Sequence, residues 1–207
     1  MSKTLKIPPD KRTKPDLPVR QFSLNEYHRL VEVGVLTPSD RVELINGWIV
    51  PKVPQNEPHA TVVEWLTLWL AKYIDDERYS LRCQLPLTLK GDCEPEPDFA
   101  VVKLAKQRER KQHPSGNDVF LVIEVADSSL GQDRGEKLEM YAANQIPEYW
   151  IVNLIDRQVE VHTSPVSGKR PAYHSRSLYM PGDYVPFGLG NVSKGMSVKK
   201  AFDLNGN

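Results

Sequence analysis

The most constraining feature of the sequence is an apolar run, Val119-Phe120-Leu121-Val122-Ile123, that ends at Glu124. Successive side chains of a β-strand point to opposite faces of the sheet. A run that is apolar at every position therefore predicts a strand covered on both faces, in the centre of a sheet. By the same alternation, Glu124 projects from the face that carries Val122 and Phe120. The pattern places a carboxylate at the end of a core strand, on a face that is otherwise buried.

Capping signals, hydrophobic periodicity and turn residues predict the remaining elements. Two residues of the type Asn46-Gly47 between apolar runs are a strong signal for a hairpin. Helices are expected over residues 23–34, 59–75 and 131–144, and from about 197 to the C-terminus. Strands are expected over 41–45, 48–53, 79–89, 98–102, 119–126, 148–153, 158–163, 174–179 and 184–187.

The order of these elements defines the expected fold class. A helix, a hairpin, a second helix, three strands, a helix and then further strands do not form a regular βαβ alternation. The order indicates an α/β (α+β) protein with a mixed sheet covered by helices. Residues 1–21 carry several prolines among charges and are expected to form a flexible arm. The rest of the chain, 22–207, is long enough to bury the core of one domain.

Composition excludes several classes of protein. The N-terminus has charges and prolines where a signal peptide needs an apolar segment, and no apolar stretch is long enough to span a bilayer. Cys83 and Cys93 are the two cysteines, and their spacing indicates neither a disulfide framework nor a zinc site. A cytoplasmic protein without a membrane partner is therefore expected. The formal net charge is +0, which argues against broad electrostatic binding of nucleic acid but leaves room for a local basic groove.

Three acidic residues occupy places where structural residues are usually apolar. Asp98 opens the apolar run 99–102, Glu124 ends the central run, and Glu43 stands between Val42 and Leu44 in the expected hairpin. A carboxylate among core strands is costly unless a cation or a metal compensates it. Carboxylate oxygens are also the ligands that Mg²⁺ prefers. For Glu43 alone, solvation of a strand end is the favoured interpretation, whereas Asp98 and Glu124 together favour function.

Five blocks of sequence, in this order, resemble one protein family. They are Glu43-Leu44-Ile45-Asn46-Gly47, Glu96-Pro97-Asp98-Phe99-Ala100-Val101-Val102, Val122-Ile123-Glu124-Val125 with Ser128-Ser129, Asp133-Arg134-Gly135-Glu136-Lys137-Leu138-Glu139-Met140-Tyr141-Ala142, and Pro147-Glu148-Tyr149-Trp150-Ile151-Val152. The family is a bacterial group of putative restriction endonucleases in the PD-(D/E)XK nuclease superfamily. The resemblance runs from about Phe22 to the C-terminus.

This resemblance implies a restriction-endonuclease-like fold, with a central mixed β-sheet flanked by helices and the acids at one edge of the sheet. It implies that Asp98 is the motif aspartate, Glu124 the second acid and Glu43 the acid contributed from upstream. The carbonyl of Val125 would add an oxygen ligand for Mg²⁺ or Mn²⁺. The superfamily places a lysine two residues after the second acid, where this chain has Ala126, and Lys137 on the following helix is the expected replacement.

Three further residues are accessory candidates with simpler alternatives. His59 is expected to touch the site or to cap its helix, and Tyr141 to bond a site carboxylate or to pack in the core. Asp133 stands four residues before Lys137, so the two form either part of the site or an ordinary helical ion pair worth about 0.2–0.5 kcal/mol.

The function that follows is a Mg²⁺-dependent nuclease that hydrolyses phosphodiester bonds of DNA, with Glu43, Asp98, Glu124 and Lys137 as catalytic residues. RNA as the substrate stays open, and a homodimer is compatible with the way in which many nucleases of this fold cut two strands. The alternative from another class is a nuclease fold that no longer cuts and binds nucleic acid or a protein partner. A metal-dependent hydrolase of small molecules would need an enclosed apolar pocket instead of an open groove.

Overall fold

The centre of the protein is a six-stranded sheet with the order β3-β4-β5-β6-β7-β8. The structure is a computed structural model that describes residues 19–74, 77–104, 112–190 and 192–203. Its central strands are β3 (Tyr79–Cys83), β4 (Phe99–Lys103), β5 (Val119–Ala126), β6 (Glu148–Asn153), β7 (Gln158–Val166) and β8 (Ala172–Tyr179). The pair β5 and β6 is parallel and the other neighbours are antiparallel, so the sheet is mixed as the fold class predicted.

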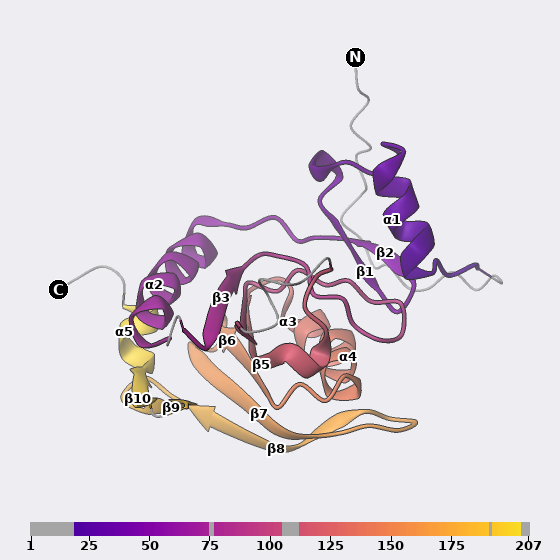
Figure 1. Cartoon of the computed structure of the whole chain (residues 1–207). Coiled ribbons are helices and arrows are strands. Elements are labelled where there is room, and N and C mark those ends of the chain that lie inside the picture. The colour runs from indigo at the N-terminus through magenta and orange to yellow at the C-terminus, as the bar shows by residue number, and fades with distance from the viewer. Residues whose placement is uncertain (1–18, 75–76, 105–111, 191, 204–207) are drawn as a thin grey trace.

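Helices and two small hairpins cover this sheet (Figure 1). The helix α2 and the short helix α5 lie with the β9–β10 hairpin on one side, and α3, η3 and α4 lie on the other. The helix α1 and the β1–β2 hairpin lie beside one another at the margin. Their bounds are α1 (Leu24–Glu32), η1 (Pro38–Asp40), β1 (Val42–Ile45), β2 (Trp48–Pro51), α2 (Glu57–Tyr73), η2 (Gly116–Asp118), α3 (Leu130–Gln132), η3 (Asp133–Lys137), α4 (Leu138–Ala143), β9 (Tyr184–Leu189), β10 (Val192–Ser197) and α5 (Val198–Phe202).

The central strand β5 is covered on both faces, as its apolar run predicted. Leu121, Ile123 and Val125 belong to the apolar cluster that contains α2 and the β9–β10 hairpin. Val122 and Ala126 belong to a second cluster, which contains α4 and the loop before β4. Glu124 lies between these last two in the alternation and therefore faces α4.

The β1–β2 hairpin turns at Asn46-Gly47, where both residues have positive φ angles, 50° and 76°. Such a turn matches the twist of the two strands, and glycine adopts its second position without steric cost. A side chain at Gly47 would also collide with Gln21, whose Cβ lies 2.7 Å from the place of an added Cβ. The hairpin prediction is confirmed, and the turn is held against the segment that precedes α1.

Strand β3 is shorter than the expected range 79–89. It ends at Cys83 because Gln84 adopts a left-handed φ of 51° and Pro86 follows, so the ladder cannot continue. The loop that follows carries Glu94, whose amide and carbonyl pair with Leu44 of β1. This bridge fixes the β1–β2 hairpin against the approach to β4.

The helix expected over 131–144 is present as three consecutive helical segments. The segment η3 joins α3 to α4, and it is kinked at Gly135, whose φ of −105° and ψ of −106° are not helical. On either side of this kink, η3 carries Asp133 and Lys137.

The C-terminal region contains one strand that periodicity did not predict. Strand β10 pairs with β9 over its whole length, and its alternation is obscured by Ser193, Lys194 and Gly195. The expected terminal helix follows as α5, and its N-cap Ser197 accepts a hydrogen bond from the amide of Lys200.

One expectation cannot be compared with the structure over most of its length. Most of the arm expected over 1–21, residues 1–18, lies outside the described residues. Among the helices that the structure describes, none has the length and apolar character needed to cross a bilayer.

Candidate active site

Four acidic side chains meet in one pocket of about 450 Å³ at the ends of the central strands. Glu43 comes from β1, Asp98 from the residue before β4, Glu124 from β5 and Asp133 from η3. Phe99 is opposite Ile123 in the β4–β5 ladder, so the next pair outward is Asp98 beside Glu124. The structure thus brings together the acids that the sequence singled out.

Glu43 reaches this place through the bridge between Leu44 and Glu94. That bridge lays β1 along the segment that leads into β4, and the amide of Glu96 donates to Oε2 of Glu43 over 3.1 Å. The Glu43 side chain is buried. Since its oxygen accepts a backbone hydrogen bond within the pocket, Glu43 does not merely solvate the end of a strand.

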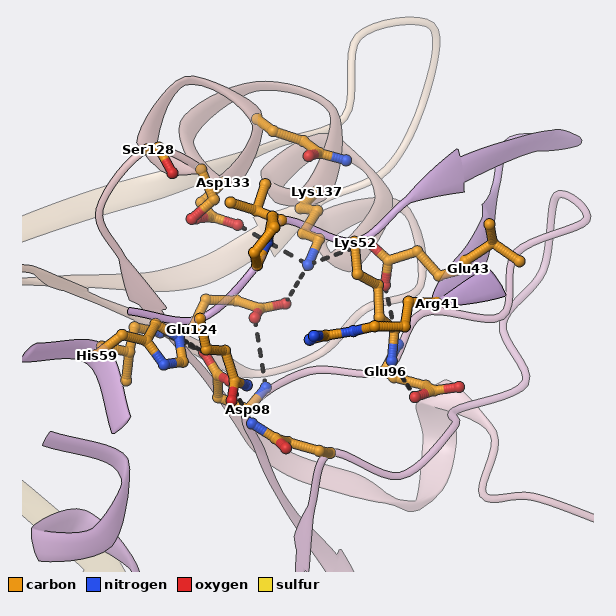
Figure 2. A pocket seen from close by; sticks show the side chains of 18 of the residues that line it. Arg41, Glu43, Lys52, His59, Glu96, Asp98, Glu124, Ser128, Asp133 and Lys137 are labelled. Carbon is orange, nitrogen blue, oxygen red and sulfur yellow. Dashed lines mark hydrogen bonds and ion pairs between the residues drawn. The ribbon is translucent and has the colours of Figure 1, made fainter. Parts of the chain in front are cut away.

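Lys137 lies among three of these acids (Figure 2). Its Nζ is 2.9 Å from Oε1 of Glu124, 3.4 Å from Oε1 of Glu43 and 3.9 Å from Oδ1 of Asp133. The residue is only 7% exposed. An ion pair confined to the helix surface would involve Asp133 alone at high exposure, so the simpler interpretation of this lysine does not describe the structure.

Glu124 is the most connected of the acids. Its Oε1 also accepts from the hydroxyl of Tyr141 at 2.8 Å, and its Oε2 accepts from the amide of Asp98 at 3.4 Å. Tyr141 is fully buried, so it belongs to the core and to the site at once. These contacts hold the carboxylate in one orientation.

Asp98 is held by three donors from different elements. Its Oδ2 lies 2.8 Å from the amide of Val125 and 3.1 Å from Nε2 of His59, and its Oδ1 accepts from the amide side chain of Gln84 at 3.2 Å. Burial raises the pKa of the Asp98 carboxyl, but the hydrogen bonds and the nearby imidazole outweigh it and bring the pKa below its ordinary value. Asp98 therefore stays ionised.

Burial raises the pKa of two further carboxyls of the pocket, those of Glu124 and Asp133. Burial, opposed by Lys137 and reinforced by Asp133, Asp98 and Glu43, raises the pKa of Glu124 to about 8. Burial likewise raises the pKa of Asp133 to about 6.

The pKa of Lys137 is also raised, which keeps its side chain protonated. Burial would lower the pKa of this ammonium, but attraction to Glu124, Glu43 and Asp133 outweighs burial and raises it well above the ordinary value. The lysine is thus a permanent cation, able to donate hydrogen bonds and unable to act as a base at neutral pH.

The donor set fits a hard divalent cation. Four carboxyl groups lie in the pocket, and three of them share the buried ammonium of Lys137, so an additional positive charge would relieve their repulsion. Asp133 is 1% exposed, and neither of its carboxylate oxygens has a hydrogen-bond partner among the described residues. In the ranges that the structure describes, no three His, Cys, Asp or Glu side chains form a complete metal-binding group. Backbone oxygen or water would have to complete the coordination.

Some residues of the pocket were not singled out by their sequence pattern. Arg41, Lys52, Gln84 and Glu96 line it, and Lys52 forms an ion pair with Glu96. Arg41 precedes Glu43 by two residues but lies outside β1 in a left-handed conformation, so strand alternation does not place it in the pocket. Gln84 gives no signal in the sequence, because only the loop conformation brings it to Asp98.

The fold and the pocket together define a class. A mixed sheet whose neighbouring strands β4 and β5 carry Asp98 and Glu124 at one edge, with a lysine against the second acid, is a restriction-endonuclease-like architecture. The family model of Uma2, described as putative restriction endonuclease, matches residues 24–188. The chain belongs to this family, and its membership supports a nuclease-like function.

A solved structure shows the same fold. It is the crystal structure of a putative nuclease belonging to DUF820 from Anabaena variabilis ATCC 29413, with a TM-score of 0.65 and 16% sequence identity. The similarity covers 88% of this chain and 98% of that one. No curated protein sequence matches the chain.

Proposed function

We propose that the protein is a metal-dependent endonuclease of the cytoplasm that hydrolyses phosphodiester bonds of DNA. The observation that carries the proposal is the position of Lys137, 2.9 Å from Glu124 and 3.4 Å from Glu43. The superfamily pattern needs a lysine beside the second acid, and this chain has Ala126 at the usual place. A lysine from the next helical segment supplies the missing ammonium.

Asp98, Glu124 and the carbonyl of Val125 are the groups that would hold Mg²⁺ or Mn²⁺. A divalent ion bound there lowers the pKa of an attacking water and neutralises charge that develops on the phosphate. Asp98 suits the role because its pKa is lowered, so that it is ionised before an ion arrives. Glu124 would lose its proton when the ion binds, because a nearby cation favours the charged form.

The chain's own groups orient and polarise the substrate. The raised pKa of Lys137 keeps its ammonium charged, and a charged donor in a desolvated site stabilises negative charge effectively. Glu43 and Asp133 maintain that charge. Tyr141 fixes the orientation of Glu124, and His59 fixes that of Asp98, which gives these two residues positioning roles.

The proposal is tested by incubation of supercoiled plasmid and labelled DNA oligonucleotides with the purified protein in Mg²⁺ and in Mn²⁺. Cleavage should require the ion and stop on chelation, and Asp98→Asn should abolish it. RNA of the same sequence serves as a parallel substrate. Double-strand cuts at matched positions, together with the mass from sedimentation, would indicate a homodimer. Absence of cleavage with either ion would reject the proposal, as would cleavage that survives Asp98→Asn.

One observation favours a second candidate, a nuclease fold that binds without cutting. All four carboxylate oxygens of Asp98 and Glu124 already accept a hydrogen bond from the protein. A site of this kind is satisfied without an ion. Binding of DNA with unchanged affinity in the presence of Mg²⁺, and without any cleavage, would favour this candidate over the enzyme.

A further inference from the structure

Two cationic side chains flank the open end of the β1–β2 hairpin, at the mouth of the pocket. Val42 is opposite Pro51 in the ladder, so the next pair outward is Arg41 and Lys52, and the amide of Lys52 donates to the carbonyl of Arg41 over 2.8 Å. Arg41 and Lys52 both line the pocket, as does Glu43.

The two cations differ in their partners. The ammonium of Lys52 forms an ion pair with Glu96, so its charge is already compensated. The guanidinium of Arg41 makes no hydrogen bond or ion pair with any residue in the described ranges, although several carboxylates share its pocket. Figure 2 shows the Arg41 side chain extended into the pocket in the direction of Glu124. Three cations line the pocket, namely Arg41, Lys52 and Lys137. Among the described residues, Lys52 and Lys137 have acidic partners and Arg41 has none.

The direction of Arg41 is set by its backbone. The residue ends η1 in the left-handed conformation, with φ 49° and ψ 61°. The turn before it is closed by Asp40, whose Oδ2 accepts from the amide of Thr37 over 2.7 Å. A side chain on a fixed backbone loses less freedom when a ligand binds. Arginine, lysine and methionine are all unbranched at Cβ, so replacement of Arg41 by either of the other two leaves the strain at this φ nearly unchanged.

A polyanion that approaches this pocket would meet many acids. Six carboxylates line the pocket, namely Glu43, Glu96, Asp98, Glu124, Asp127 and Asp133. The negative charges of these carboxylates would repel a phosphate group appreciably in a partly desolvated cleft. A phosphate group needs a compensating donor there, and the planar fork of arginine matches two phosphate oxygens at once.

We infer that Arg41 binds a phosphate of the nucleic-acid backbone at the mouth of the pocket, next to the phosphodiester bond that reaches the acids. The ligand class rests on the proposed function, whereas the binding step is independent of catalysis. This contact carries no sequence information, because every nucleotide presents the same phosphate.

The test measures binding separately from cleavage. Fluorescence anisotropy with a short labelled DNA duplex is recorded over a series of salt concentrations in Ca²⁺, which shares the preference of Mg²⁺ for carboxylate oxygens. Gel electrophoresis confirms that the probe stays intact. The variants are Arg41→Met and Arg41→Lys, with Arg157→Met as the control, because Arg157 forms an exposed ion pair with Asp203 and does not line the pocket. Single-stranded DNA and RNA probes identify the form of nucleic acid.

Arg41→Met should weaken binding about tenfold, the value of one charge-assisted hydrogen-bonding contact, for every sequence of the probe. It should also reduce the slope of log K against log salt by about 0.9, since one phosphate contact is lost. Arg41→Lys should retain the slope and lose part of the affinity, and Arg157→Met should change neither.

Equal affinity and slope for Arg41→Met and Arg157→Met would overturn the inference, even in a protein that cleaves DNA. Failure of the wild type to bind any of the probes would overturn it as well. A wild type that binds through Arg41 but does not cleave would support the inference and reject the proposed endonuclease activity.

Discussion

The ammonium of Lys137 lies 2.9 Å from Oε1 of Glu124, although the residue two positions after Glu124 is an alanine. Ala126 shares the face of Glu124, is fully buried and packs in the apolar cluster beneath α4. A lysine there would have to place its stem among apolar side chains that leave no space. Lys137 reaches the same carboxylate from the kinked segment η3 instead.

Replacement of this lysine should separate catalysis from folding. Lys137→Met keeps the apolar stem and removes the charge, and on the proposed function it should lower the rate of plasmid nicking by roughly 10²–10³, the cost of losing one charge-stabilising donor. The fold should persist at pH 6, because the buried carboxyls can take up protons instead. Lys72→Met, at an exposed position of α2, is the control. Nicking at the wild-type rate by Lys137→Met would leave the cation of the site unassigned.

The stability of the metal-free protein should depend on pH through Glu124. Its pKa is about 8 in the folded protein against an ordinary value of 4.5, so the folded state binds more protons between these values. The contribution of protonated Glu124 to the free energy of unfolding is therefore fully present below about pH 4.5 and is lost as the pH rises towards 8. Glu124→Gln should flatten this fall, so that its melting temperature relative to the wild type increases from pH 5 to pH 8 in chelator. Parallel pH curves for the two proteins would contradict the buried, proton-binding carboxyl.

Divalent ions should stabilise the native protein by mass action. Binding at a concentration one hundred times the dissociation constant adds about 2.7 kcal/mol, so Mg²⁺ or Mn²⁺ should raise the melting temperature. Asp98→Asn should remove most of the increase in melting temperature, because it removes the carboxylate that is already ionised before the metal ion binds. Glu64→Gln, which alters an exposed acid outside the pocket, should retain it. A wild-type melting temperature that does not respond to either ion would count for the non-cutting alternative.

A second buried carboxylate anchors the segment that carries Lys137. Glu160 of β7 is 0% exposed and accepts from the guanidinium groups of Arg134 in η3 and Arg176 in β8. Glu160→Gln should lower the free energy of unfolding by about 2 kcal/mol, because the two charge-assisted contacts weaken. Asp156→Asn affects an exposed partner of the same Arg134 and should change it by no more than about 0.5 kcal/mol. Urea unfolding at pH 7 measures the free energy of unfolding of both variants. Equal decreases for the two variants would contradict a special stabilising role of Glu160.

Local signals in the sequence were sufficient for much of the fold. The unbroken apolar run predicted β5 as a central strand, and Asn46-Gly47 predicted the hairpin. Capping signals contributed to the helix expected over 23–34, and both hydrogen bonds of a capping box are present at Ser23, before α1. The predictions differ from the structure where the backbone departs from a period. Gln84 ends β3 early, and the helix expected over 131–144 is present but kinked at Gly135.

By itself, the sequence determined which strand is central, where the hairpin turns and which acids stand in places that a core would not tolerate, because strand period, turn chemistry and the cost of buried charge act within a few residues. Tertiary structure decided which of these groups meet. Glu43 reaches Lys137 because Leu44 pairs with Glu94, and Arg41 faces the pocket because its hairpin is held there. Those contacts depend on hydrogen bonds and packing between segments far apart in the chain, which no local pattern encodes.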